Sequence, residues 1–395
     1  LHLLSRRQRQ MCIRDSTYSW LVNGKEYSTE PTFSYKIDNP CRADLTCIIK
    51  NKYGKVEMST SFSSNHNFSK GFFYVADGTF NFYDTEKKTA YQDCYASLNA
   101  GKTLGIGNYD SANIIHSNGK FYLLVGTSTS NRDHFYIVDA KTLYYENSAA
   151  VGANLSGLTI LNEQYGLVTG DGIRRIDLKS LNNVRIKNER LLCFYNSIIY
   201  NGKVLSNDTY KDESKVKYYD VNELIAAKEG EAPAVTELDI IQKQKINFVL
   251  AKDGNVYTLE SADNGCNIVK IKNDFTLEKV FANFQPAKGP YHSSPTIGMV
   301  ASETENIIYL VSTDGAIYKY ILGDSDSLKA PFIAAESGVS ITAPLQLNQQ
   351  SGELYVTYTE ELKDESKIVV YSKDGKVLHT VDCGESVPSQ ILFNN

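Results

Sequence analysis

The sequence predicts an all-β chain whose main part is a seven-bladed β-propeller, preceded by a small β-domain. The first observation is a unit of about 40–55 residues that recurs from Phe73 to Asn395. In each unit, an aromatic or aliphatic strand leads to a turn built on Asp or Lys and then to a short second strand. Repeats of this length with several short strands are typical of propeller blades. The seven copies of the turn lie at residues 81–89, 135–142, 175–180, 217–223, 269–276, 318–326 and 369–375.

The two ends of the repeat region supply the second observation. The first copy begins at residues 71–75 and has no inner strand of its own, whereas residues 387–395 resemble an inner strand with no blade after it. Pairing the two would remove two open sheet edges, which otherwise favour aggregation. We therefore expect residues 389–393 to complete the first blade and close the ring.

The composition supports an all-β chain. There are 27 Tyr, 16 Phe and one Trp, alongside many short runs of Val, Ile and Leu, which suits half-buried strands. Only residues 223–229 show a helical pattern, of one or two turns within a loop. No apolar run approaches the roughly 18 residues that a membrane helix needs. The cysteines lack metal-type spacing, which favours buried free thiols over a disulfide framework.

The first sixteen residues are set apart from the fold. Residues 6–16 resemble the translation of a transposase-type sequencing adapter, and the alternative is a basic tail. We expect the true N-terminus, with any signal peptide, lipid-anchor cysteine or further domain, to be missing. Without the four Arg and one Asp of this segment, the 41 basic and 46 acidic residues become 37 and 45, a net charge of −8. This charge argues against a nucleic-acid or anionic-membrane surface.

Four regions follow from these observations. They are a probable adapter artefact (1–16), a small β-domain (17–63), a linker (64–70) and the propeller (71–395). In the small domain, Trp20 lies on an alternating strand that turns at Asn23-Gly24, a strong hairpin signal. A later strand alternates Leu45, Cys47 and Ile49. The segment resembles the last two-thirds of a PKD-like immunoglobulin sandwich, which implies a truncated domain with Trp20 in its core.

The segments that lead into the inner strands are the candidate ligand site. In a propeller they surround the mouth of the central channel on one face. Here they carry amide, hydroxyl and aromatic side chains, which suit a neutral polar ligand. The alternative is that these groups only satisfy backbone atoms at strand starts. The candidate ligand-binding residues are Tyr109, Asn154, Tyr195, Asn196, Gln244, Tyr291, His292, Thr342 and Ser389.

No convincing catalytic or metal motif is present, and we predict neither catalytic residues nor a bound cofactor. The six histidines form no local Ser/His/Asp arrangement. Residues 208–213 lack the Gly and the final Glu of a calcium loop and fit a solvated turn. The one Trp lies outside the propeller, which excludes blades docked by tryptophan, both the quinoprotein type and the Trp-Asp repeat.

Several stretches resemble the exported, YncE-like surface propeller lipoproteins of gut Bacteroidetes. These are residues 70–78, 82–84 and 98–105 at the start, and 331–332, 351–356 and 368–378 at the end. The resemblance spans about residues 70–395. The family usually has Asn-Glu-Gly where this chain has Ala76-Asp-Gly78, and the chain lacks the propeller tryptophans of the cobalamin-capturing members.

The resemblance implies a lipid-anchored protein of the outer-membrane surface that works beside a TonB-dependent transporter. It implies capture of a small-molecule nutrient, with a corrinoid as the leading candidate and a glycan as the competitor. His292 could reach a cobalt axial position, although a hydrogen-bonding His at a strand start is commoner. A propeller hydrolase or lactonase and a purely structural surface protein are the alternative classes.

Overall fold

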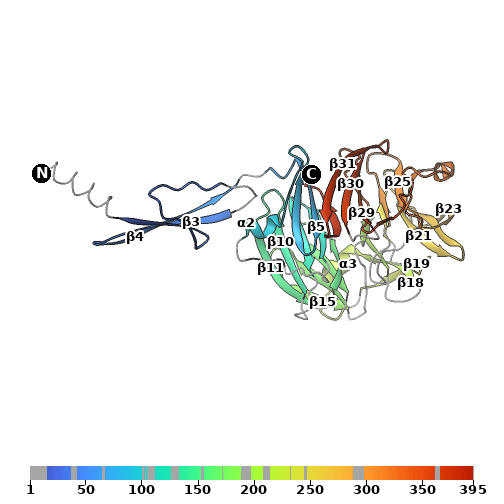
Figure 1. Ribbon diagram of the computed structural model, residues 1–395. Helices are drawn as coiled ribbons and strands as arrows, with labels where there is room; N and C mark the ends of the chain where they lie inside the picture. Colours follow the sequence, from blue (N-terminus) through green and yellow to red (C-terminus); the bar gives the residue numbers. More distant parts are fainter. Residues whose placement is uncertain are drawn as a thin grey trace.

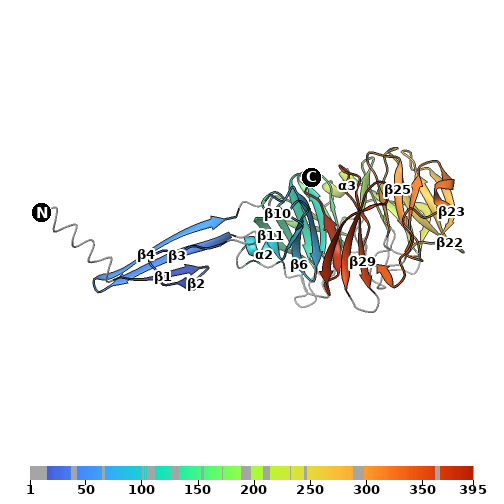
Figure 2. The same cartoon turned by 45° about the horizontal axis from the view of Figure 1, so that its top comes forward.

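The fold is described here from a computed structural model. It covers residues 16–36, 42–64, 67–99, 102, 104, 112–125, 133–152, 155–170, 172–187, 197–207, 214–231, 233–243, 247–287, 298–360 and 365–394. Within these residues the chain forms eight sheets, one near the N-terminus and seven that follow one another in the rest of the chain (Figure 1). A view turned by 45° shows the N-terminal sheet as an arm that projects from the propeller (Figure 2). The predicted all-β propeller is confirmed.

The first four blades each have four antiparallel strands, and the first strands of blades 2 and 3 lie against each other. Blade 1 is β32 (Pro388–Leu392), β5 (Gly71–Ala76), β6 (Thr79–Asp84) and β7 (Thr89–Tyr91); blade 2 is β8 (Ala112–Ser117), β9 (Lys120–Val125), β10 (Asp133–Asp139) and β11 (Tyr145–Gly152); blade 3 is β12 (Leu155–Ile160), β13 (Tyr165–Gly170), β14 (Gly172–Asp177) and β15 (Asn183–Lys187); blade 4 is β16 (Ile198–Tyr200), β17 (Lys203–Asn207), β18 (Ser214–Asp220) and β19 (Val235–Gln242).

The last three blades depart from this pattern in two places. Blade 6 has three strands, and in place of a fourth it has the 3-10 helix η1 (Ser325–Leu328) and a bridge between Ile317 and Ile333. In blade 7 both β27 and β28 pair with β29. Blade 5 is β20 (Val249–Leu250), β21 (Val256–Ala262), β22 (Gly265–Ile271) and β23 (Leu277–Phe284); blade 6 is β24 (Met299–Ala301), β25 (Ile307–Val311) and β26 (Ile317–Ile321); blade 7 is β27 (Val339–Ile341), β28 (Gln346–Leu347), β29 (Leu354–Glu360), β30 (Ser366–Tyr371) and β31 (Val377–Gly384).

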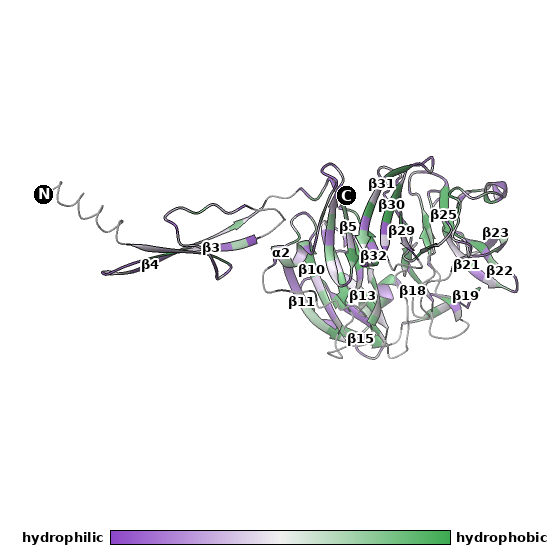
Figure 3. Ribbon diagram, in the orientation of Figure 1, coloured by the Kyte–Doolittle hydropathy of each residue, from purple (hydrophilic) through white to green (hydrophobic). Residues whose placement is uncertain are grey.

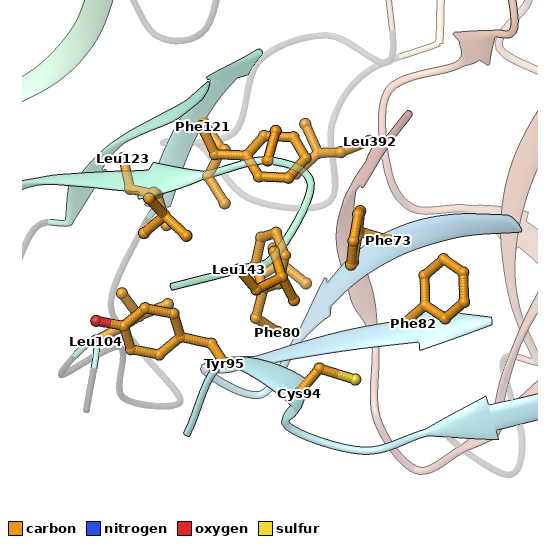
Figure 4. Close-up of a cluster of buried hydrophobic side chains, with 14 of the residues drawn as sticks. Phe73, Phe80, Phe82, Cys94, Tyr95, Leu104, Phe121, Leu123, Leu143 and Leu392 are labelled. Carbon is orange, nitrogen blue, oxygen red and sulfur yellow. The ribbon is translucent and has the colours of Figure 1, made fainter. Parts of the chain in front are cut away.

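Seven clusters of buried apolar side chains join the blades into a ring. Each cluster takes its members from two consecutive blades, and the last one joins blade 7 to blade 1. Figure 3 shows hydrophobic residues in green on many of the propeller strands. Between blades 1 and 2, Phe73 and Phe121 pack edge to face at 5.4 Å between ring centroids (Figure 4). Because successive residues of a strand point to opposite sheet faces, each blade contributes to both of its neighbours.

The ring closes through β32, as the sequence predicted. This strand pairs antiparallel with β5, with Ile391 opposite Tyr74 and Leu392 opposite Phe73. Ile391 belongs to the cluster between blades 7 and 1, and Leu392 belongs to the cluster between blades 1 and 2. The strand β32 therefore contributes buried side chains to two interfaces between blades.

The repeated Asp turns have a common physical basis. In blades 1 to 4 the third strand ends at an Asp whose carboxylate accepts hydrogen bonds from backbone N–H groups two or three residues further on, as in an Asx-turn. Asp84 accepts from Glu86 and Lys87 at 3.0 and 2.9 Å, Asp177 from Lys179 and Ser180 at 3.1 and 2.7 Å, and Asp220 from Asn222 and Glu223 at 2.8 and 3.1 Å. Asp139 accepts from the Thr142 N–H at 2.7 Å.

The N-terminal sheet has the order β2-β1-β3-β4. The Trp20 ring stacks on Phe33 at 5.7 Å, and its indole N–H donates to the Glu30 carbonyl oxygen at 3.0 Å. Cys47 is buried, as expected. The described residues form this one sheet, and the sandwich interpretation remains a prediction. The strands are β1 (Thr17–Val22), β2 (Lys25–Ser28), β3 (Arg42–Asn51) and β4 (Gly54–Ser63).

Helices are few among the described residues. α3 (Val221–Ala226) overlaps the expected short helix, and α2 (Cys94–Leu98) begins after Asp93, whose carboxylate accepts from the Ala96 N–H. No helix within the described residues is long and apolar enough to cross a membrane. The described cysteines Cys47, Cys94, Cys266 and Cys383 are free thiols.

The closure predicts a large effect from the last strand. Deleting residues 387–395 should lower the melting temperature sharply and cause aggregation, because β5 becomes an open edge. Ile391→Ala should lower the free energy of unfolding by about 2–5 kcal/mol, since Ile391 is buried between two blades. Glu385→Ala, at an exposed position, is the control. Denaturant unfolding measures both, and a deletion variant as stable as the intact chain would contradict this account of the closure.

The Asp turns predict a loss of stability in acid. The N–H of Ser180 lowers the pKa of Asp177 in the folded chain. A group with a lowered folded pKa stabilises the fold above its unfolded pKa of about 4, and this contribution is lost as the pH falls through the folded pKa. Asp177→Ala should therefore cost about 1–2 kcal/mol at pH 7 and less near pH 3.

Asp374→Ala is the matched control, because Asp374 lies exposed in an Asp-Gly turn. Chemical denaturation at the two pH values tests the turn account. Equal losses in the two variants, or a loss from Asp177→Ala that does not change with pH, would show that the carboxylate does not hold the turn.

Candidate ligand-binding face

All the innermost strands begin at one end of the propeller, which we call the top face. Each runs antiparallel to the strand beside it, so the second strand of every blade ends at the same face. The top face therefore gathers the first residues of β8, β12, β16, β20, β24, β27 and β32 and the last residues of their partners. The opposite end, where the Asp turns lie, is the bottom face. The sequence placed the predicted ligand-binding residues in segments that lead into innermost strands, but of the two described ones Thr342 follows β27 and Ser389 lies within β32.

Most of those residues cannot be placed. Tyr109, Asn154, Tyr195, Asn196, Gln244, Tyr291 and His292 lie outside the described residues. Their role in binding remains a prediction from the sequence.

The other two, Thr342 and Ser389, are engaged within their own blades. The hydroxyl groups of Thr342 and Thr359 lie 2.9 Å apart within hydrogen-bonding distance, and the Thr342 N–H donates to the Thr357 carbonyl oxygen at 3.2 Å. The Ser389 hydroxyl donates to the Val75 carbonyl oxygen at 3.3 Å. For these two, the observed contacts are those of groups that satisfy strand ends.

Two amide side chains near this face connect neighbouring blades. Gln390 accepts from the Ile114 N–H at 3.3 Å and donates to the Ile114 carbonyl oxygen at 2.7 Å. Asn247 does the same with Met299, at 3.0 and 2.6 Å. Each amide thus pairs with the innermost strand of the next blade as a short piece of backbone would. At Gly298, with φ of +72°, an added Cβ would lie 2.7 Å from Asn247 Oδ1, so glycine fits this contact.

A buried polar network joins blades 4 and 5. The Asn207 amide donates to Gln242 Oε1 at 2.5 Å, and Gln242 Nε2 donates to Thr258 Oγ1 and to the Leu259 carbonyl oxygen, both at 3.0 Å. The Thr258 hydroxyl donates in turn to the Asn247 carbonyl oxygen at 3.0 Å. Buried polar groups need such partners. The sequence analysis missed this network, because its members come from three different strands and from the segment before β20.

In blades 2, 3 and 7, three buried polar atoms have no hydrogen-bond partner among the described residues. They are Asn113 Nδ2, Thr169 Oγ1 and Thr357 Oγ1, on side chains that are 5%, 1% and 1% exposed. A buried donor without a partner costs about 1–3 kcal/mol. Each of these atoms could bind water or a ligand. Their signal in the sequence is a polar residue within an otherwise apolar strand.

Two further observations concern the protonation of a histidine and the capacity of the described residues to bind a metal ion. Burial lowers the pKa of His116, which favours its neutral form, and its ring lies 5.2 Å from that of Phe121. Among the described residues, no three His, Cys, Asp or Glu side chains lie close enough together to hold a metal ion.

Three solved structures illustrate what this chain is similar to. The crystal structure of a quinoprotein alcohol dehydrogenase-like protein from Bacteroides thetaiotaomicron is 99% identical in sequence, with a TM-score of 0.92 over 96% of this chain and 91% of that chain. The dihydro-heme d1 dehydrogenase NirN matches at 13% identity and a TM-score of 0.47, over 88% of this chain and 73% of that one. TolB from Acinetobacter baumannii matches at 12% identity and a TM-score of 0.41, over 81% and 80%.

One family profile matches the propeller. No curated protein matches the chain. The profile of a domain of unknown function, DUF5074, matches residues 68–394, which is nearly the whole propeller and the end of the linker. This chain therefore belongs to the DUF5074 family.

Proposed function

We propose that this chain is a non-catalytic ligand-capture protein of the bacterial cell surface. It is exported, held at the outer membrane by an N-terminal lipid, and passes a nutrient to a TonB-dependent transporter. The near-identical crystal structure comes from a Bacteroides protein, which agrees with this setting. The observation that carries the proposal is the succession of amide, hydroxyl and aromatic residues in the segments that precede the innermost strands.

A corrinoid is the expected ligand. It is a broad, flat ring edged with amides, which many separate amide and aromatic groups could hold at once. The described part of the top face adds buried polar atoms without partners, at Asn113, Thr169 and Thr357. Such a region favours a ligand that hydrogen-bonds at many points. A surface glycan is the competing ligand, because tyrosines also stack on sugars.

Calorimetry of the purified chain with cyanocobalamin and with a polysaccharide panel tests this proposal. We expect sub-micromolar corrinoid binding that weakens tenfold or more, about 1.4 kcal/mol, in Tyr195→Ala or Tyr291→Ala. Tyr53→Ala is the control, because Tyr53 is 75% exposed in the N-terminal sheet. Glycan binding without corrinoid binding would overturn the ligand and keep the capture role. No binding of any kind would favour a structural surface protein.

An enzyme is the second candidate, raised by the name of the near-identical crystal structure. The donor set of the described residues does not fit a quinone held beside a metal ion. The only tryptophan, Trp20, is in the N-terminal sheet, so the propeller offers no tryptophan on which a planar cofactor could stack. We derive no step through a quinone.

A calcium-dependent hydrolase or lactonase is the other enzyme alternative. Propellers of this kind hold a central Ca²⁺ through carboxylate and amide oxygens. We expect the purified protein to contain less than stoichiometric calcium and to show no esterase or dye-linked alcohol dehydrogenase activity. Elemental analysis and the two assays check this. One calcium per chain, removed by a chelator together with an activity, would favour the enzyme.

A further inference from the structure

A cavity lies at the bottom face, where the linker meets the propeller. Its volume is about 600 Å³, within the usual range of ligand pockets. Four separate segments line it: the linker with Asn67 and Phe68, the end of α2 with Leu98, the turn between β10 and β11 with Lys141 and Tyr144, and the segment after β32 with Asn394. We call it the junction cavity. It is at the opposite end of the propeller from the predicted ligand ring.

Hydrogen bonds fix the walls of the junction cavity. Asn99 donates to the Leu143 carbonyl oxygen at 2.8 Å and accepts from the Tyr145 N–H at 2.7 Å, so that the β10–β11 turn is attached to α2. Asn394 donates to the Ala140 carbonyl oxygen at 2.7 Å and attaches the end of the chain to the same turn. A bound molecule would not have to order this turn, and a pre-formed site loses less free energy on binding.

Lys141 is the one charged side chain among the described residues that line the cavity. The lining contains Lys141 and no Asp or Glu. The carboxylate of Asp139, two residues before Lys141, accepts from the N–H and the hydroxyl of Thr142, both at 2.7 Å. The Arg42 guanidinium lies 5.7 Å from the centre of the Tyr144 ring. The ammonium group of Lys141 forms no ion pair with another described residue.

The rest of the lining combines an apolar floor with polar side chains. Phe68 and Leu98 are 3% and 2% exposed, and Tyr144 is half-buried. Asn394 keeps its amide oxygen free to accept, because the observed bond uses its NH₂ group. An aromatic ring suits the C–H face of a sugar, amide and hydroxyl groups suit its hydroxyls, and an ammonium group suits a carboxylate.

We propose that the junction cavity binds a sugar acid, a cyclic polyol that carries one carboxylate. Lys141 pairs with the carboxylate, Tyr144 lies against the ring, and Asn394 accepts from a hydroxyl. This site is separate from the corrinoid or glycan site proposed for the top face. Binding at the junction cavity and binding at the top face can therefore be confirmed or refuted independently.

The chain offers a matched control for Lys141. The turn Asp139-Ala-Lys141-Thr142-Leu143 recurs in blade 3 as Asp177-Leu-Lys179-Ser180-Leu181, with Leu143 and Leu181 both at positive φ, 58° and 59°. Lys179 is exposed like Lys141 but does not line the cavity. Lys179→Met thus removes an equivalent charge from an equivalent turn.

Calorimetry of the full chain with D-glucuronate, D-glucose and acetate tests the proposal. We expect glucuronate to bind at least tenfold more tightly than glucose, Lys141→Met to remove this preference, and Lys179→Met to leave it unchanged. Tyr144→Ala should weaken glucuronate binding tenfold, and none of the variants should change cyanocobalamin binding. Equal binding of glucose and glucuronate, equal losses in the two lysine variants, or no glucuronate binding at about 10 mM would overturn the proposal.

Discussion

The pairing of β32 with β5 is the contact on which the rest of the structure depends. Seven interfaces surround the ring, and each blade needs both neighbours to bury its two apolar faces. β32 has only five residues, yet Ile391 enters one interface and Leu392 enters the next. Gln390 adds two hydrogen bonds to the innermost strand of blade 2. Without this strand blade 1 would lose its inner edge, and the interfaces on both sides of it would be exposed to water.

The two faces of the propeller differ in how their polar groups are hydrogen-bonded. At the bottom face the chain turns locally, and Asp carboxylates satisfy the backbone within a few residues. At the top face the polar side chains instead reach across blades, as Gln242 and Asn247 do. Much of the polarity near the top face thus stabilises the ring. Among the described residues, buried atoms of Asn113, Thr169 and Thr357 have no hydrogen-bond partner and could bind water or a ligand.

The features that the sequence predicted are local or depend on the chain ends. Asp177 and Asp220 make their turns with residues two and three positions away, so a short pattern was enough. The missing strand of blade 6 could not be predicted, because residues 318–326 look like the other turns and the bridge from Ile317 goes to Ile333. Nor could a sequence pattern tell whether Ser389 faces a ligand or Val75, since that depends on a strand 314 residues away.

The junction cavity links ligand binding to the closure of the ring. Asn394 follows β32 by two residues and also lines the cavity, while the linker on the other wall leads directly into β5. A molecule in the cavity would therefore contact segments next to both strands of the closing pair. A ligand that binds only the folded state adds its binding free energy to stability. The same ligand would then also oppose the opening of blade 1, which takes part in two of the seven interfaces.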